Sequence, residues 1–158
     1  MRRLVISVLC GVLVLTLAGC FMVEDSARAP FPVQQVDGAL QIMSCTTGRI
    51  VGLEVTERKK SSQEWQTILE VESFDVALER NQLISETAVK AGTVVTKQAL
   101  DLSPGDEILV GVSKAPDTTA YAAFTVPDGG LPTEEWLQPD GKVTEDACSL
   151  YTTTNQSE

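Results

Sequence analysis

The sequence contains no histidine. This absence excludes serine–histidine and cysteine–histidine nucleophile systems, zinc sites with histidine ligands, and the usual general base near neutral pH. The chain also lacks a phosphate-binding loop and a dinucleotide-binding fingerprint. Two carboxylates can still act as acid and base, as in glycosidases, but 22 Asp and Glu residues make chance pairs common. We therefore predict a protein that is not an enzyme, with no catalytic residue, metal site or cofactor. A carboxylate-based hydrolase of wall glycan is the remote alternative.

Basic and aromatic residues are both scarce. The chain has 12 Lys and Arg residues against 22 Asp and Glu residues, which gives a net charge of −10. So acidic a domain repels phosphate, and this excludes nucleic acid and anionic lipid surfaces as partners bound through charge. Only 5% of the residues are aromatic. We therefore expect a core made mainly of Val, Leu, Ile and Ala.

The one long apolar run is short for a transmembrane helix. It covers residues 4–17, directly after Met1, Arg2 and Arg3, whereas a helix that spans a bilayer needs about 20 apolar residues. A basic start, a short apolar run and small residues after it are typical of a secretory signal peptide. An uncleaved anchor is the alternative. Cleavage would remove both arginines and take the net charge from −10 to −12.

The run ends in Leu17-Ala18-Gly19-Cys20, which resembles the lipobox of bacterial lipoproteins. The resemblance implies removal of residues 1–19, cleavage between Gly19 and Cys20, and lipidation of Cys20 by a diacylglyceryl group with fatty-acid chains such as palmitate. Two or more acyl chains hold a protein stably on a membrane, at about 0.8 kcal/mol for each buried CH₂ group. We expect the exported protein to be anchored at the outer face of the cytoplasmic membrane.

Two of the four cysteines are left for a disulfide. Cys10 lies in the expected signal peptide and Cys20 in the lipobox, so Cys45 and Cys148 remain. An even pair in an exported chain predicts a disulfide bond. Two free buried thiols are the alternative.

From residue 39 onward the pattern indicates an all-β domain. We predict a lipidated N-terminus and flexible tether over 20–38, an antiparallel β-sandwich over 39–126, a loop-rich C-terminal arm over 127–151 and a frayed tail over 152–158. Alternating apolar and polar residues predict short strands separated by turn residues, over 40–45, 50–58, 65–71, 93–96, 107–114 and 121–126. Residues 74–87 fit either short strands or a helical turn.

Residues 102–110, Leu-Ser-Pro-Gly-Asp-Glu-Ile-Leu-Val, are similar to a turn and strand of fibronectin type III and other immunoglobulin-like domains. The resemblance implies an immunoglobulin-like sandwich, in which Trp65 would be the buried tryptophan. The tyrosine that usually follows this turn is absent. The lipobox, the Pro-rich tether and residues 124–132 before the last cysteine also resemble small lipoproteins of Gram-positive actinobacteria, a resemblance that implies location and fold but no activity.

Two groups of residues are candidates for a binding surface. Trp136 and Leu137 lie in the Gly- and Pro-rich arm and form either an exposed ridge or a cap over the core. Arg58, Lys59 and Lys60 are the one basic cluster and form either an anion-binding patch or a solvated hairpin tip.

Acidic residues near the turns are weaker candidates, for binding calcium. They are Asp101, Asp106, Glu107 and Asp128. Calcium takes carboxylate and carbonyl oxygens from such loops, but no EF-hand pattern is present, and the same residues are ordinary in turns.

We therefore predict a lipid-anchored binding or accessory module of the cell envelope. Its partners would be the membrane, through the lipid on Cys20, and an envelope protein or wall polymer, with no nucleic acid. A purely structural envelope lipoprotein is the alternative.

Overall fold

The computed structural model describes residues 30–116 and 118–151. The predicted signal peptide, Gly19, Cys20, the first part of the predicted tether and the tail 152–158 lie outside the described residues. No helix within the described part is long and apolar enough to cross a membrane.

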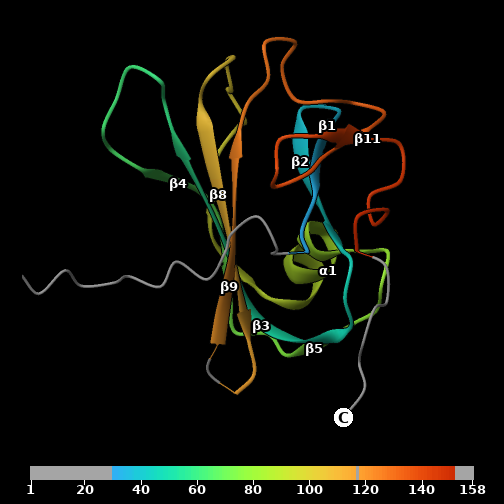
Figure 1. Cartoon of the computed structure of the whole chain (residues 1–158). Coiled ribbons are helices and arrows are strands. Elements are labelled where there is room, and N and C mark those ends of the chain that lie inside the picture. The colour runs from blue at the N-terminus through green and yellow to red at the C-terminus, as the bar shows by residue number, and fades with distance from the viewer. Residues whose placement is uncertain (1–29, 117, 152–158) are drawn as a thin grey trace, which may run out of the picture.

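Two antiparallel sheets pack face to face (Figure 1). In spatial order, the first sheet contains β11 (Val143–Thr144), β10 (Trp136–Leu137), β1 (Val33–Val36), β2 (Ala39–Ser44) and β6 (Gln82–Leu83). The second contains β7 (Thr93–Lys97), β4 (Gln66–Glu72), β3 (Gly48–Arg58), β8 (Glu107–Lys114) and β9 (Thr118–Thr125), and β5 (Val76–Leu78) pairs with β3. One helix, α1 (Ile84–Ala91), lies on the side of the first sheet and packs against β2. The expectation of an all-β sandwich of antiparallel sheets is confirmed.

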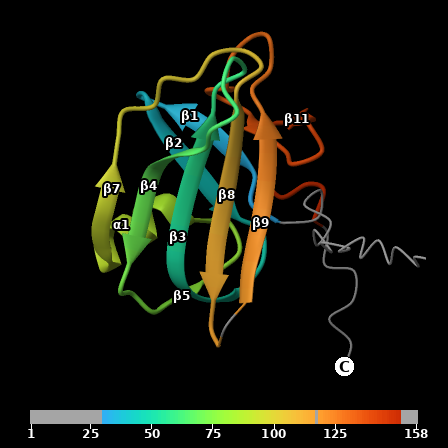
Figure 2. The same ribbon diagram turned by 90° about the vertical axis from the view of Figure 1, so that its left-hand side faces the viewer.

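The core follows from the alternation of side chains in the long strands. In β3, Leu53 and Val55 are at most 2% exposed, and in β8, Ile108, Val110 and Val112 are fully buried. Successive side chains of a strand point to opposite faces, so these residues meet the first sheet across the sandwich. The residues between them face outward. Figure 2 views the second sheet from that outer side.

The tether prediction is wrong from Pro30 onward. Phe31 is 1% exposed and Val33 is fully buried, and β1 pairs Val33 with Ile42 of β2. The prolines do not prevent this, because their carbonyl groups still accept hydrogen bonds. The Met43 N–H donates to the Pro32 carbonyl at 3.0 Å. The domain therefore begins before residue 39.

The C-terminal arm is part of the sandwich. Its strand β10 pairs with β1, with Val33 opposite Leu137, and β11 pairs with β10. The arm therefore extends the first sheet by two short strands.

Residues 74–87, which the sequence left open, divide between strands and helix. β5 and β6 take the first part, and α1 begins at Ile84, which is fully buried with Ala88. Gly92, directly after the helix, touches the second sheet. A Cβ atom there would lie 2.6 Å from Val71 and 2.7 Å from Phe74, so only glycine fits without a shift.

Candidate functional site

The outer face of the second sheet is set by strand register. Arg58 of β3 lies opposite Glu107 of β8, which lies opposite Thr125 of β9. Two rows farther along the same face, Glu54 lies opposite Gly111, which lies opposite Tyr121. These side chains belong to the outward set of each strand, so they form one continuous surface across three strands.

A hollow at one end of this face has Trp65 as a wall. It has a volume of about 450 Å³. Leu109, Ala123 and Thr125 line it, the turn 139–141 of the arm borders it, and Trp65 is 43% exposed. The prediction that Trp65 is the buried tryptophan is therefore wrong. The residue precedes β4, where the chain leaves the hairpin loop, and its ring lies on the outer side.

Arg58 fixes the Trp65 ring. The centre of its guanidinium lies 4.8 Å from the ring centroid. Its Nε donates to Glu107 at 2.6 Å, and Nη2 donates to the same carboxylate oxygen. A cation over an aromatic face is attracted by the ring quadrupole. The cross-strand ion pair thus holds the arginine, and the arginine holds the tryptophan.

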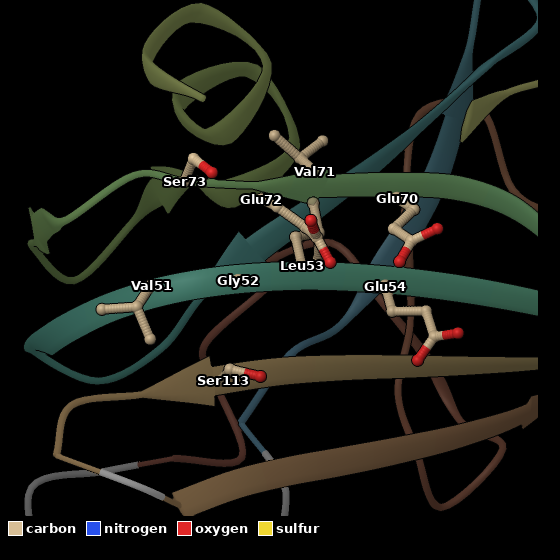
Figure 3. A pocket seen from close by; sticks show the side chains of 9 residues that line it. All are labelled: Val51, Gly52, Leu53, Glu54, Glu70, Val71, Glu72, Ser73 and Ser113. Carbon is tan, nitrogen blue, oxygen red and sulfur yellow. The ribbon is translucent and has the colours of Figure 1, made fainter. Parts of the chain in front are cut away.

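A second hollow lies farther along the face, with a volume of about 460 Å³. Figure 3 shows Glu54 and Glu70 side by side on adjacent strands, at one side of Gly52, with Glu72 near them. Glu54 is directly opposite Glu70, and like charges in this position repel. No group of three or more Asp, Glu, Cys or His residues in the described chain is placed to hold a metal ion.

Tyr121 lies on the same face, in the row of Glu54 and Gly111. Its ring covers Gly111, where a Cβ atom would be only 2.9 Å from the tyrosine Cε1 atom. The ring therefore rests on the backbone of β8, and its side chain remains 47% exposed. Gly111 is needed here for close approach rather than for backbone freedom.

The basic cluster does not form a patch. Lys59 Nζ lies 3.4 Å from Glu57 Oε1 and 3.3 Å from Asp106 Oδ2, and it donates to the Asp101 carbonyl. The Lys60 side chain lies over Gly105. Since Lys59 is neutralised by buried carboxylates, the interpretation of Arg58, Lys59 and Lys60 as an anion-binding surface is not supported. Only Arg58 belongs to the outer face.

Asp106 is the centre of that arrangement. Burial alone would raise its pKa, but the N–H groups of Lys60 and Ser103 donate to its carboxylate at 2.9 Å, and Lys59 lies beside it. These interactions prevail and hold the pKa of Asp106 below its ordinary value. Burial likewise opposes the charge of Lys59, yet its bonds to Asp106 and Glu57 raise its pKa. The carboxylates near this turn thus serve to hold its loops.

The arm residues Trp136 and Leu137 form the core cap, the second of the two predicted alternatives, and not a binding ridge. Trp136 is 8% exposed and Leu137 only 1% exposed. The two side chains point to opposite faces of the strand. Leu137 packs in the main core, and Trp136 packs with Cys45, Ala147 and Cys148. Little of their apolar surface is left for a partner.

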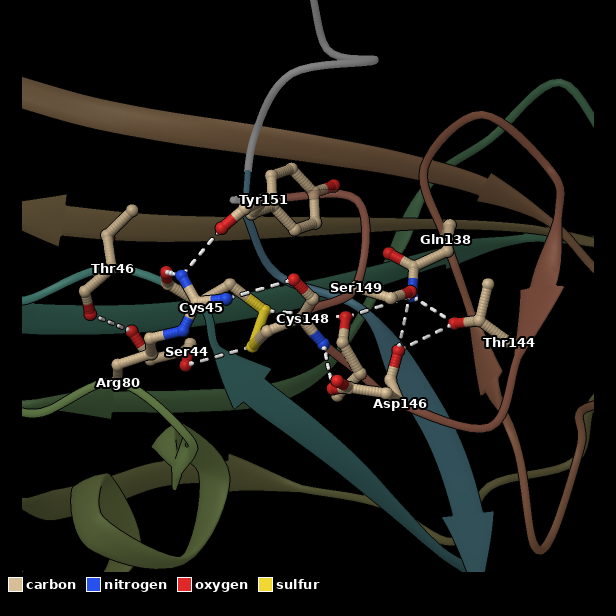
Figure 4. Close-up of a disulfide and its surroundings, with 11 residues drawn as sticks. Ser44, Cys45, Thr46, Arg80, Gln138, Thr144, Asp146, Cys148, Ser149 and Tyr151 are labelled. Carbon is tan, nitrogen blue, oxygen red and sulfur yellow. Dashed lines mark hydrogen bonds between the residues drawn. A yellow bond between two sulfur atoms is a disulfide. The ribbon is translucent and has the colours of Figure 1, made fainter. Parts of the chain in front are cut away.

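The predicted disulfide is confirmed. Cys45 and Cys148 are joined, with their Cα atoms 5.2 Å apart. Figure 4 shows Arg80 beside the bond. Its guanidinium donates to the carbonyls of Cys45 at 3.2 Å, Cys148 at 3.0 Å and Tyr151 at 2.6 Å. The bond and the arginine together fasten the end of the arm to β2.

A third cavity of about 520 Å³ opens between the sheets beside α1. Its floor includes Val55 and Ile68, and its sides include Leu40, Leu69 and Val89. These residues are members of the main core or pack against it. The groove could hold an apolar group, but its lining is already explained by core packing.

Comparison with known proteins found no match: no family model, curated protein or solved structure is similar to this chain. The outer face is therefore the candidate site on geometry alone. Sequence reasoning missed Tyr121, Glu54 and Glu70 in it. A tyrosine at an outward position of the alternating run 121–126 was the available signal.

Proposed function

We propose that the chain is an exported lipoprotein whose domain binds a component of the cell envelope, without catalysis, at the outer face of the cytoplasmic membrane. Residues 17–20 support the anchor because they fit the lipobox in full. The Cys45–Cys148 bond supports export because disulfides persist in oxidising compartments.

The single observation that supports binding is the exposure of two aromatic side chains on one sheet face. Trp65 and Tyr121 are 43% and 47% exposed, and neither contributes to the core. Each is held in place, Trp65 by Arg58 and Tyr121 by Gly111. Fixed aromatic rings lose little entropy when a partner covers them. This favours a binding module over a purely structural lipoprotein.

We assign the sandwich to the immunoglobulin-like type. The support is the turn at Pro104 and Gly105, which leads directly into β8, a central strand of the second of two antiparallel sheets. The Gly105 N–H donates to the Val126 carbonyl at 2.9 Å, so the turn closes against the end of β9.

The anchor is tested by Cys20→Ala. We expect the wild type to fractionate with membranes and to take up a fatty-acid label, because acyl chains on Cys20 hold it there. The variant should take up no label and appear as an uncleaved or released protein. A variant that still fractionates with membranes in a shortened, mature form would contradict the lipoprotein proposal. Cys10→Ala is the matched control and should behave as wild type.

A further inference from the structure

We propose that the outer face of the second sheet binds a neutral glycan chain along a strip that we call the Trp65–Tyr121 strip. The strip consists of Trp65, Arg58, Glu107, Leu109, Ala123 and Tyr121. This inference rests on the proposed function and names the class of envelope component.

The exposed rings of the strip are suited to stacking on sugars. Six large hydrophobic side chains are exposed in residues 30–116 and 118–151, and the two aromatic ones, Trp65 and Tyr121, both lie on this strip. An aromatic face offers a flat apolar surface of large area. A sugar ring presents its C–H groups on one side and can stack there while its hydroxyl groups remain free for hydrogen bonds.

The two rings are spaced for an extended chain. The outward side chains of β9 include Tyr121, Ala123 and Thr125. Thr125 lies in the same row as Arg58, whose guanidinium lies over the Trp65 ring. A strand rises about 3.3 Å per residue, so the Tyr121 and Thr125 rows are about 13 Å apart. That span exceeds one sugar ring. Leu109 and Ala123 leave a low floor between the rings, so the strip fits an extended chain rather than a single sugar.

Polar groups that can bind sugar hydroxyl groups lie beside the rings. Arg58 and Glu107 form a planar donor and acceptor pair that is about one third exposed on each side chain. Glu54 lies in the Tyr121 row and Glu70 beside it. Carboxylates and a guanidinium are well placed to exchange hydrogen bonds with hydroxyl groups.

Charge decides which glycans fit. Glu54, Glu70 and Glu72 line the hollow next to Tyr121, and the chain as a whole has a net charge of −10. Polymers rich in phosphate or carboxylate would be repelled along this face. The strip therefore selects neutral glycans. A proline-rich peptide, which also docks on aromatic side chains, is the competing occupant.

The test uses the full chain, purified from membranes in detergent. The probes are neutral oligosaccharides built from N-acetylglucosamine, mannose or glucose, a wall teichoic acid as the anionic polymer, and a proline-rich peptide. We expect a neutral oligosaccharide to bind. Trp65→Ala and Tyr121→Ala should each weaken this binding about tenfold, as expected for loss of one stacked ring. Tyr121→Phe keeps the ring and should bind as wild type.

Val143→Ala is the matched control, because Val143 is 41% exposed but belongs to the first sheet. It should leave the affinity unchanged. The thermal midpoint of each variant shows that it is folded. The inference is overturned by binding of the peptide or teichoic acid in place of every neutral probe, by no binding at all, or by equal affinities of wild type and both Ala variants. If these results occur while the wild type remains lipidated and on the membrane, the glycan inference fails and the anchor stands.

Discussion

Asp106 joins two segments that are distant in the sequence, residues 59–60 and 101–106. Its carboxylate accepts the N–H of Ser103 within its own turn and the N–H of Lys60 from the β3–β4 loop, both at 2.9 Å. It also pairs with Lys59, whose Nζ donates to Asp101 in the segment before β8. One buried carboxylate therefore holds the loops at one end of the second sheet.

The pH dependence of stability follows from this carboxylate. Because the pKa of Asp106 is lowered in the folded state, its stabilisation is complete above the unfolded pKa of about 3.9 and is lost as the pH falls below that value. We expect Asp106→Asn to lower the free energy of unfolding at pH 7 by about 1.5–3 kcal/mol, the worth of hydrogen bonds to a charged group. The variant should also flatten the fall of the thermal midpoint in acid.

Asp75→Asn is the control for this prediction. Asp75 is also paired with a cation, Arg49, at 2.5 Å, but both side chains are more than half exposed. Such surface pairs contribute about 0–1 kcal/mol. Equal losses in the two variants at pH 7, measured by denaturant unfolding, would show that Asp106 has no special role.

The two tryptophans show what single residues reveal before the fold is known. The sequence placed Trp65 in the core and left Trp136 open between an exposed ridge and a core cap, whereas the structure exposes Trp65 and buries Trp136. Local patterns could not decide this. Trp136 is buried because β10 pairs with β1, a contact between residues more than one hundred positions apart. The disulfide was predictable because Cys10 and Cys20 belong to the predicted signal peptide and lipobox. Cys45 and Cys148 then remain as an even pair in an exported chain.

Among the elements, β1 was missed and the long strands were found. β3 and β8 alternate over eight or more residues, which is a strong local signal. β1 has only four residues and follows two prolines, so it reads as a linker. Its place is decided by partners on both sides, β2 and β10, and such long-range pairing leaves no local pattern.

The strands of the C-terminal arm, β10 and β11, have only two residues each. The arm therefore depends on the disulfide and on the hydrogen bonds of Arg80 to stay in place. We expect Cys148→Ser to lower the thermal midpoint, because a disulfide that closes a loop of about 100 residues contributes on the order of 4.7 kcal/mol in the chain-entropy account. Strand content by circular dichroism should change little, since the second sheet keeps its core. Trp136 fluorescence should shift to the red as the arm loosens.

Ser149→Ala is the control, because Ser149 is exposed and adjoins the bond. It should leave the midpoint and the Trp136 spectrum as in wild type. An unchanged midpoint in Cys148→Ser would mean that Arg80 and strand pairing alone hold the arm.

At the scale of the whole molecule, the two sheets have different surroundings. The first sheet carries the arm, the disulfide and α1, whereas the second exposes its outer face across β3, β8 and β9 (Figures 1 and 2). The sequence predicted the antiparallel sandwich, because alternation reports which residues face the core. Of the candidate site it named only Arg58 as a binding residue and Glu107 as a weaker acidic candidate, because the strip is assembled by register between strands, which alternation within one strand does not determine.

The central claim is an exported lipoprotein with an oxidised domain, and intact mass spectrometry of the membrane-extracted protein tests it most directly. The sample is treated with a thiol-alkylating reagent before and after reduction. We predict a mass that lacks residues 1–19 and includes acyl chains, with no alkyl adduct before reduction and two afterwards, on Cys45 and Cys148. A mass that retains residues 1–19 or lacks lipid, or adducts on both cysteines before reduction, would contradict the account.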